Sequence, residues 1–313
     1  MDLEKALGFV SEPQPVSWNQ RDHLLYAAGI GAKNDELQFL YELSKDWHPF
    51  PTYPLVLVFK GDSQELNNFA ESQLRGGKAP GLPATDPNKG LHAEQSIEII
   101  KSIPAVSGPG WMLSKKLVGI KDTGKGLIVD ASLELTSPQG EVYVRMVSSS
   151  YLIGKFNAGG FNKSTVPPQP YKGLGKPPTE SADKVFSEKT TPEQAILYRL
   201  SGDYNPLHID PNIGKAIGFP GCILHGLSSY GHAARAIVLS VAGGDGRRLK
   251  FMSARFTTPV LPGDELETHM WLSPAENGAT RVDFIQKVKQ SGKICLGGGV
   301  AVIAKPTTTG SKL

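Results

Sequence analysis

The same opening occurs twice in this chain. Residues 17–29 read SWNQRDHLLYAAG and residues 191–202 read TPEQAILYRLSG, so in both a Ser or Thr is followed three residues later by Gln. That spacing is typical of a capping box at a helix start, and apolar residues follow at helical spacing through Tyr26 or Tyr198 until Gly ends each helix. Pro192 is expected at the first helical position, where its missing N–H costs little. We interpret the two openings as an old duplication with a period of about 170 residues.

Most of the remaining sequence predicts strands. Runs rich in β-branched and aromatic residues are separated by turn residues, and hairpin turns are expected at SPQGE and QSGK. The expected strands are 54–60, 96–103, 117–120, 126–137 and 141–154 in the first half, and 250–260, 264–273, 280–290 and 293–304 in the second. Sequential strands joined by short turns form antiparallel sheets, and a helix followed by such strands in each half predicts an α+β fold. We therefore expect two antiparallel sheets, each wrapped around a helix.

The two halves differ in the helix that the sheet would wrap. In the second half, apolar residues from Ile223 to Val241 follow helical spacing on several faces of a Gly-bounded segment, which predicts a long buried helix. The matching residues 60–90 of the first half offer one short amphipathic helix and then a Pro/Gly-rich loop. The first half is therefore expected to have lost or shortened its central helix.

A Pro/Gly-rich stretch from Val166 to Lys184 separates the halves. It is interpreted as a linker, because such a composition sustains neither a helix nor a central strand. The predicted organisation is an N-terminal domain, a linker, a C-terminal domain and a polar tail, with bounds 1–165, 166–184, 185–308 and 309–313.

Composition argues against several classes of protein. With 39% hydrophobic and 20% charged residues, the chain is typical of a soluble globular protein. No apolar run approaches the ~18–20 residues that span a bilayer, and residues 1–10 lack the features of a secretory signal. The net charge of +3 and the lack of a dense Lys/Arg stripe do not support nucleic-acid binding. Cys222 and Cys295 lack metal spacing and are expected to be reduced thiols.

One short run could carry acid–base chemistry: YRLSGDYNPLHID, residues 198–210. Gly202 and Pro206 break helices, and Asp and Asn favour turns, so the run predicts a tight loop. Such a loop is either a plain turn or a place where an acid, Asp203, is held near a base, His208. The first half has AAGIGAKNDELQF at the corresponding place, so any chemistry of this loop belongs to the second half.

The segment from Tyr198 to His208, followed by Ala216, closely resembles the signature of the hydratase 2 (MaoC-like) family, whose members are 2-enoyl-CoA hydratases with a hot-dog fold. Four further segments are similar to those of the eukaryotic two-hot-dog members, including the hydratase part of peroxisomal multifunctional enzyme type 2. They are GLHAEQSIEI around His92, LIGKFNAGGFNK at 152–163, PGCILHGLSSYG at 220–231 and ARFTTPVLPGDEL at 254–266. The resemblance implies a free-standing double hot-dog protein whose C-terminal domain is catalytic.

The resemblance also implies a hydro-lyase that converts trans-2-enoyl-CoA to (3R)-3-hydroxyacyl-CoA, and back, in peroxisomal fatty-acid β-oxidation. Adding water requires acid–base groups for two proton transfers and hydrogen-bond donors for the developing oxyanion. Asp203 and His208 are the implied acid–base pair, and which of them moves which proton stays open, because coupled groups titrate as a unit. The backbone N–H of Gly226, at the start of the central helix, is the implied oxyanion donor. Asn205 is implied to shape the site.

Substrate contacts are implied by the same resemblance for His92, Ala93, Phe256, Tyr204, Pro206 and Leu207. Pro206 also restricts Asn205 to extended backbone, which helps to aim His208 toward Asp203. His225 is expected to pack or to form a hydrogen bond locally. Four basic residues of the second half could either bind the CoA phosphates or form a solvated rim. They are Arg247, Arg248, Lys250 and Arg255.

No metal or redox cofactor is expected, because the seven histidines are scattered and no glycine-rich βαβ fingerprint occurs. CoA enters only as part of the acyl-CoA substrate. The terminal Ser311, Lys312 and Leu313 match the signal read by the peroxisomal import receptor, which predicts the peroxisomal matrix. The family further implies a homodimer, and neither nucleic acid nor membrane is an expected partner.

Three alternative functions remain on the sequence alone. A hot-dog acyl-CoA thioesterase would direct water at C1 of the thioester instead of C3. A non-catalytic acyl-CoA-binding protein would need neither Asp203 nor His208, and a related dehydratase would act on a different thioester. Since the first half lacks its full central helix, we further hypothesise that it leaves an apolar cavity for long or bulky acyl chains.

Overall fold

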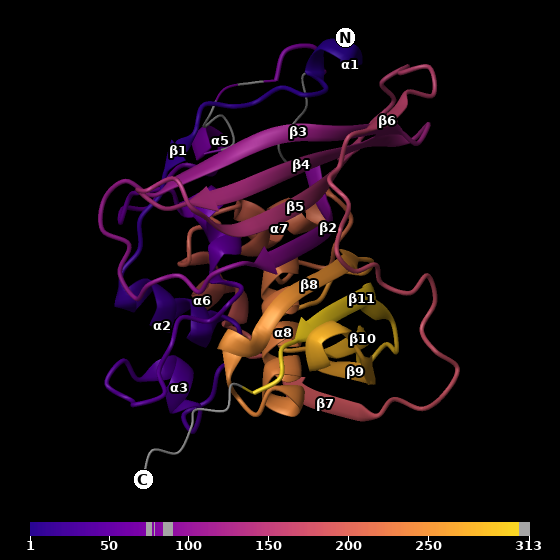
Figure 1. Ribbon diagram of the computed structural model, residues 1–313. Coiled ribbons are helices and arrows are strands. Elements are labelled where there is room, and N and C mark those ends of the chain that lie inside the picture. Colours follow the sequence, from indigo (N-terminus) through magenta and orange to yellow (C-terminus); the bar gives the residue numbers. More distant parts are fainter. Residues whose placement is uncertain (73–76, 78, 84–89, 307–313) are drawn as a thin grey trace.

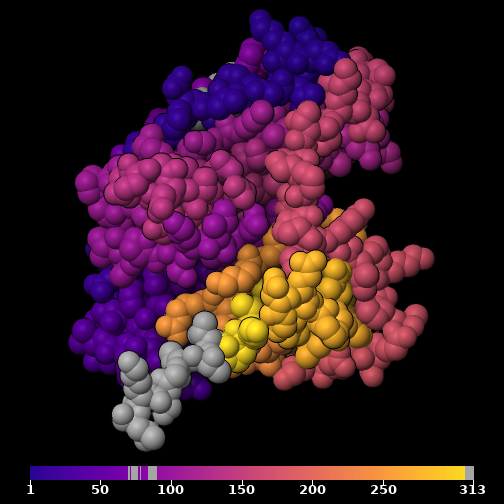
Figure 2. All heavy atoms as spheres, viewed as in Figure 1, coloured from indigo at the N-terminus to yellow at the C-terminus, as the bar shows by residue number. Residues whose placement is uncertain are grey.

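One continuous antiparallel sheet of 11 strands runs through the molecule (Figure 1). The computed structural model describes residues 1–72, 77, 79–83 and 90–306. In the space-filling view, the first half of the chain, indigo to magenta, lies directly against the second half, orange to yellow (Figure 2).

The elements have the following bounds. The first-half strands are β1 (Gln14–Pro15), β2 (Gly90–Ile99), β3 (Met112–Asp122), β4 (Gly126–Thr136), β5 (Val142–Ile153) and β6 (Asn162–Ser164). Those of the second half are β7 (Lys184–Lys189), β8 (Leu249–Phe256), β9 (Glu265–Pro274), β10 (Thr280–Val288) and β11 (Ile294–Ile303). The first-half helices are α1 (Leu3–Ala6), α2 (Gln20–Gly29), α3 (Leu37–Leu40), η1 (Tyr53–Val56), α4 (Leu57–Lys60) and α5 (Phe69–Ser72). The second-half helices are α6 (Gln194–Arg199), η3 (Pro206–His208), α7 (Pro211–Ala216), α8 (Gly226–Val241), η4 (Gly246–Arg248) and η5 (Glu276–Gly278).

The strand order repeats itself about the junction of β2 with β8. Outward from this junction, the first half reads β2, β5, β4, β3, β1 and the second reads β8, β11, β10, β9, β7, with β6 added beside β3. Each strand of one half thus has a counterpart in the other, and β2 pairs antiparallel with β8, as a two-fold axis between them requires. The α+β double hot-dog prediction is confirmed. The two sheets expected as separate units are, however, joined edge to edge into one.

The two repeated helices pack against each other across this axis. A Cβ atom on Gly29 of α2 would lie 3.2 Å from the Cα of Tyr198 on α6, so only glycine allows this close approach. The rings of Tyr26 and Tyr198 lie 6.0 Å apart. The Gln194 side chain donates to the carbonyl of Gly29 at 2.7 Å. The repeated sequence therefore builds the contact between the halves.

The predicted helix starts were wrong in detail. Helix α2 is capped by Asn19, whose side chain forms a reciprocal capping box with Asp22, because Asn is as good a cap as Ser and an acidic residue follows three positions later. The hydroxyl of Ser17 instead donates to the carbonyl of Asp62. Helix α6 begins only at Gln194 and has no side-chain cap, so Pro192 lies in the preceding turn.

Residues 54–60 were predicted as a strand, and this was wrong. They form η1 and α4, with Leu55, Val56 and Leu57 fully buried. A short apolar run does not distinguish a strand from a buried helix, and Pro54 suits a helix start better than a sheet ladder. Strands β1, β6 and β7 were not predicted at all.

Helix α8 is the central helix of the second half, and it packs on β8, β9 and β11 (Figure 1). It has 16 residues and is buried from Leu227 to Val238, as its apolar residues on several faces predict. In the first half, the described residues between α2 and β2 contain only α3, η1, α4 and α5, of four residues each. The first half has therefore shortened its central helix, as expected.

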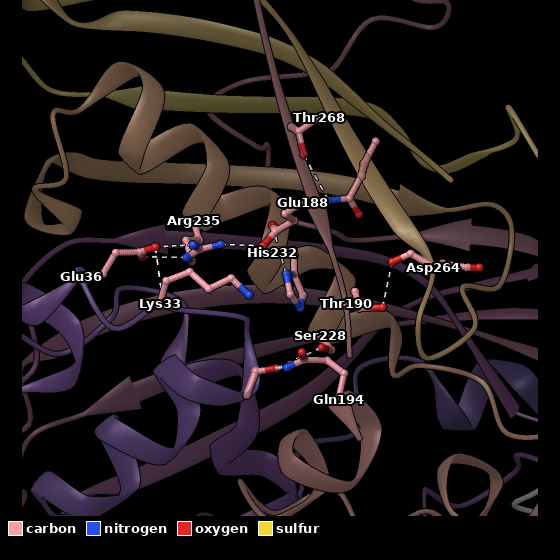
Figure 3. Close-up of polar contacts among 12 residues, drawn as sticks. Lys33, Glu36, Glu188, Thr190, Gln194, Ser228, His232, Arg235, Asp264 and Thr268 are labelled. Carbon is pink, nitrogen blue, oxygen red and sulfur yellow. Dashed lines mark hydrogen bonds and ion pairs between the residues drawn. The ribbon is translucent and has the colours of Figure 1, made fainter. Parts of the chain in front are cut away.

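A buried ionic network joins α8 to both halves (Figure 3). Arg235 of α8, which is 2% exposed, donates to Glu36 of the first half at 2.7 Å and to Glu188 of β7 at 2.6 Å. His232, one turn earlier, lies 3.1 Å from the other oxygen of Glu188. Burial alone would raise the pKa of Glu188, but His232 and Arg235 together hold it below its ordinary value.

Candidate active site

A cavity of about 840 Å³ lies between the two halves. The second half contributes the loop around Asp203 and His208, the start of α8 and the end of β8. The first half contributes η1, α4 and the inward faces of β2 to β5. The candidate acid–base pair therefore lines a cavity that both halves build.

The loop that carries Asp203 is held by its own backbone. The N–H of Asn205 donates to Oδ1 of Asp203 at 3.2 Å. The Asn205 side-chain oxygen accepts from the N–H of Leu207 at 3.0 Å and caps η3. Asn205 has φ −54° and ψ 120°, the extended geometry expected before Pro206. Asn205 thus orients the Asp203 carboxylate and begins the turn that carries His208.

His208 is 8% exposed and lines the cavity. Its Nδ1 lies 2.8 Å from the carbonyl of Ile223, and because a carbonyl only accepts, Nδ1 carries the proton. In the neutral ring the lone pair is therefore on Nε2. A ligand atom of His208, one of Asp203 and one of His225 all lie within 4.8 Å of one another. This geometry places an acid, a base and space for a water together.

The environment moves both groups toward their neutral forms. Burial raises the pKa of Asp203, although His208 and the Asn205 N–H offset part of this effect. Burial lowers the pKa of His208, and the Asp203 charge offsets part of that shift. The pKa of the acid thus rises while the pKa of the base falls, so each group is held in its charged form less firmly than it would be in water. Such opposed shifts in a cavity are typical of acid–base sites.

His225 contacts both members of the candidate acid–base pair. Its ring stacks on His208, with centroids 3.7 Å apart and planes at 28°. Its Nε2 donates to the backbone carbonyl of Asp203 at 3.2 Å, which is the local hydrogen bond that the sequence predicted. Burial holds the pKa of His225 well below its ordinary value, so the ring adds no second positive charge beside His208.

Gly226 is the first residue of α8 and lines the cavity. Within the described residues, no hydrogen bond of its backbone N–H is recorded, as expected at a helix start. A Cβ atom here would lie 3.0 Å from the ring of Phe256, so a side chain would press on the cavity wall. The start of a 16-residue helix, with the positive end of its dipole, thus lies in the wall of the cavity that Asp203 and His208 also line.

Of the six implied substrate contacts, three line the cavity and three do not. His92, Phe256 and Leu207 are in the lining, as is the site-shaping Asn205, whereas Ala93, Tyr204 and Pro206 are outside it. Ala93 is the unpaired residue of a β-bulge between His92 and Glu94, a device that re-aims the neighbouring side chain. The ring of Tyr204 packs under the guanidinium of Arg199 instead.

His92 joins the first half to the reactive end of the cavity. Its ring lies 4.7 Å from that of Phe256, and its Nε2 lies 3.1 Å from the hydroxyl of Ser148. Burial lowers the pKa of His92 to about 4, so the ring is neutral near pH 7. It therefore contributes an uncharged polar contact.

Two of the four basic candidates for CoA phosphates are already engaged. Arg247 pairs with Asp245 at 2.7 Å, and Arg248 donates to the carbonyls of Ala242 and Ala304. For Lys250 and Arg255, no ion pair is recorded in the described part of the chain, so the phosphate role remains a proposal for these two. Both cysteines, Cys222 and Cys295, are free thiols.

Several lining residues of the first half were not predicted. Gln95, Lys115, Ala131, Met146 and Ser148 all face the cavity from β2 to β5. Their strands were predicted, and alternation along each strand could have paired these residues on one face. Which face would turn toward the active site was not readable, because this depends on how the sheet curves.

No helix of the described residues is long and apolar enough to cross a membrane.

Comparison with known proteins agrees with this geometry. The MFE-2 hydratase 2 N-terminal domain matches residues 16–154, and the MaoC like domain matches residues 174–293. The chain is 38% identical to "Enoyl-CoA hydratase 2, peroxisomal" of Arabidopsis thaliana, over 91% of this chain and 90% of that protein. It is 32% identical to "Probable enoyl-CoA hydratase 2" of Dictyostelium discoideum, over 99% of each.

Solved structures give the same result. A MaoC-like dehydratase from Phytophthora capsici superposes with a TM-score of 0.87 at 34% identity, covering 99% of this chain and 100% of that one. Full-length peroxisomal multifunctional enzyme type 2 of Drosophila melanogaster superposes with a TM-score of 0.72 at 30% identity, covering 95% of this chain and 48% of that one. With relatives of this identity over nearly the whole chain and an acid–base loop at the family's signature, this protein belongs to the MaoC-like enoyl-CoA hydratase 2 family.

Proposed function

We propose that this protein is a hydro-lyase that adds water to trans-2-enoyl-CoA to form (3R)-3-hydroxyacyl-CoA, and that it also catalyses the reverse dehydration. The observation that carries the proposal is the Asp203–His208 pair at a cavity wall beside the N–H of Gly226. The names of the similar proteins, which include two enoyl-CoA hydratases 2, support the same reaction.

The mechanism follows from the chemistry of these groups. A water bound by the Asp203 carboxylate and Nε2 of His208 loses a proton as its oxygen attacks C3. The pair returns a proton to C2, so the two groups share both transfers. Negative charge that builds on the thioester oxygen is stabilised by the Gly226 N–H and the positive end of α8. Because the acid and the base come from one loop, both protons move on one face of the substrate, which gives syn addition.

The direct test is product analysis with trans-2-decenoyl-CoA. The purified protein is expected to remove the absorbance of the conjugated enoyl thioester, to release no free thiol and to form (3R)-3-hydroxydecanoyl-CoA. Release of free CoA would identify a thioesterase, and binding without turnover would identify a non-catalytic acyl-CoA-binding protein. A (3S) product would contradict the proposed arrangement of the site.

We further propose a division of labour between the two domains, which the linker 166–184 connects. The N-terminal domain, residues 1–165, holds the acyl chain, and the C-terminal domain, residues 185–308, carries out the chemistry. Support comes from the apolar cavity wall that lies where the shortened helix leaves room, and it includes Leu113, Leu117, Val129, Ala131, Leu133 and Met146.

A cavity-filling variant tests this division. Ala131 of β4 is 7% exposed and lines the cavity, so Ala131→Leu adds methyl groups to the channel. The ratio of kcat/KM for trans-2-hexadecenoyl-CoA to that for crotonyl-CoA is expected to fall about tenfold or more, since one methylene in a tight pocket changes selectivity by roughly 10–200-fold. Ala131→Ser, which adds little volume, is the control. Equal loss on both substrates would contradict the proposal.

Location and assembly are proposals as well. Relatives named as peroxisomal support the peroxisomal matrix and a role in fatty-acid β-oxidation. The proposed receptor signal, Ser311, Lys312 and Leu313, lies outside the described residues. A fluorescent protein fused before residue 1 should enter peroxisomes, and removal of these three residues should keep it out. The homodimer that the family implies can be checked by light scattering of the purified chain.

A further inference from the structure

One charged side chain lies within the apolar wall of the cavity. On β3, Leu113, Lys115 and Leu117 all line the cavity, whereas the intervening Ser114 and Lys116 do not. Successive side chains of a strand point to opposite faces, so Lys115 points to the same side as the two leucines. These leucines are buried, with 3% and 7% exposure. A lysine thus occupies a position where the strand pattern calls for an apolar residue.

The neighbours of Lys115 on the sheet are apolar. In the register, Lys115 is opposite Leu133 of β4, which in turn is opposite Met146 of β5, and both line the cavity. On its other side, the backbone carbonyl of Lys115 accepts from the N–H and the hydroxyl of Ser11, which also lines the cavity. Lys115 itself is exposed, and it lines the cavity.

Within the described part of the chain, the ammonium of Lys115 lacks a partner. Among the described residues, no hydrogen bond or ion pair to its Nζ is recorded, and Lys115 is the only Lys or Arg in the cavity lining. The one carboxylate of the first-half wall, Asp62, acts on Lys60 instead. The surrounding groups lower the pKa of Lys115, with no acidic group to offset this effect, although the side chain itself is exposed. A carboxylate bound in the cavity would give the ammonium a charge-assisted partner.

Lys115 lies far from the reacting atoms. Three strand spacings separate β3 from β2, which is about 14 Å at ~4.8 Å each. Its row of the sheet meets β2 at Ile97, which lies five residues, about 16 Å of strand, from His92 at the reactive end. The ammonium is thus up to roughly 20 Å from the reactive end. Only the far end of a long acyl chain can reach it.

We propose that Lys115 binds a carboxylate at the distal end of the acyl chain, so that the protein accepts long trans-2-enoyl-CoA substrates derived from dicarboxylic acids. This inference rests on the proposed hydratase function and names a substrate class for the same site. The carboxylate gives the ammonium the partner that the protein does not supply, while the methylene chain covers the apolar wall between them. A chain ending in a methyl group leaves the ammonium unpaired.

The test compares two substrates of equal length, trans-2-hexadecenoyl-CoA and its ω-carboxyl counterpart, by their kcat/KM ratio. Lys115→Met keeps the length and removes the charge, and it is expected to lower the preference for the ω-carboxyl substrate about tenfold or more, the size of a lost charge-assisted hydrogen bond. Lys115→Arg should retain most of the preference. Lys116→Met, the neighbouring lysine on the opposite face of β3, is the matched control and should leave the ratio unchanged.

One outcome would contradict this inference, and another would contradict the proposed function. If Lys115→Met leaves the ratio at its wild-type value, or lowers turnover of both substrates equally, the inference is overturned. If wild type hydrates neither this pair nor trans-2-decenoyl-CoA, the proposed function fails instead. Lys115→Gln provides the same comparison if the methionine variant does not fold, which its melting temperature will show.

Discussion

Replacement of Asp203 by Asn is expected to lower kcat for hydration of trans-2-decenoyl-CoA by about 10²–10⁴-fold, the usual contribution of one general acid–base group. The amide keeps the shape of the carboxylate and can still accept from Asn205 N–H, but it cannot take a proton from water. Replacement of His208 by Gln should give a loss of similar size. The double variant should lose little more than either single one, because the two groups act as a unit.

The Asp203→Asn substitution is not expected to destabilise the protein. A carboxyl whose pKa is raised by folding contributes stability below its unfolded pKa and loses this contribution as pH rises through the folded pKa. Since burial raises the pKa of Asp203, its ionised form costs stability near pH 7, and Asp203→Asn is expected to melt at the wild-type temperature or above it. Activity loss without stability loss separates a catalytic role from a structural one.

The pH profile gives a second readout. In wild type, kcat/KM should fall as pH falls through the raised pKa of Asp203, at a higher pH than for a free aspartate of pKa ~4. Asp210→Asn is the matched control, since Asp210 lies outside the cavity and Asn preserves its cap on α7. If Asp203→Asn kept more than a tenth of wild-type activity, or Asp210→Asn lost as much, the assignment of Asp203 would be wrong.

Replacement of Arg235 by Met is expected to lower the free energy of unfolding by about 3–5 kcal/mol, because it leaves the carboxylates of Glu36 and Glu188 buried without their cation. Urea unfolding followed by circular dichroism measures this change. Arg235 fixes α8 to both halves (Figure 3). We also expect the kcat of the folded variant to fall, because the start of α8 is the proposed oxyanion donor.

An exposed arginine serves as the control for this prediction. Arg145 of β5 is 53% exposed and pairs with Glu98 and Glu134, so Arg145→Met should cost at most about 1 kcal/mol. The wild-type network should also show a pH dependence that Arg235→Met reduces. The pKa of Glu188 is held low, so its contribution is present above its unfolded pKa and is lost as pH falls through the folded value. Equal free energies of unfolding for the Arg235→Met and Arg145→Met variants would contradict the proposed role of the network.

Elements with a strong local signal were predicted correctly. Helix α8 was readable because its apolar residues repeat at helical spacing, and β4, β5 and β8 to β11 because their runs are long and bounded by turns. Strands β2 and β3 were predicted only in part, over residues 96–99 and 117–120. Residues 54–60 failed because a short, uniformly apolar run carries no period, and the buried helix that they form depends on the space left by the shortened central helix.

The candidate acid–base pair could be predicted from the sequence for a similar reason. Asp203 and His208 lie five residues apart in one loop, and Pro206 and Asn205 direct that loop through local backbone geometry. The stacking of His225 on His208 was not readable, because it depends on how α8 meets the loop. Lys115 was missed as well, since a lysine in a strand is normally solvated, and only the tertiary structure shows that it lines the cavity.

By itself the sequence determined the α+β class, the duplication and the loop with its carboxyl and imidazole, because these depend on residues close together in the chain. The tertiary structure alone decided that both sheets join at β2 and β8 and that the first half supplies most of the cavity wall. It also decided the burial that shifts the pKa values of Asp203 and His208. The pairing of β2 with β8 joins residues more than a hundred positions apart, and the burial of the loop depends on how α8 and the segment before it pack on it. No local sequence pattern encodes such contacts.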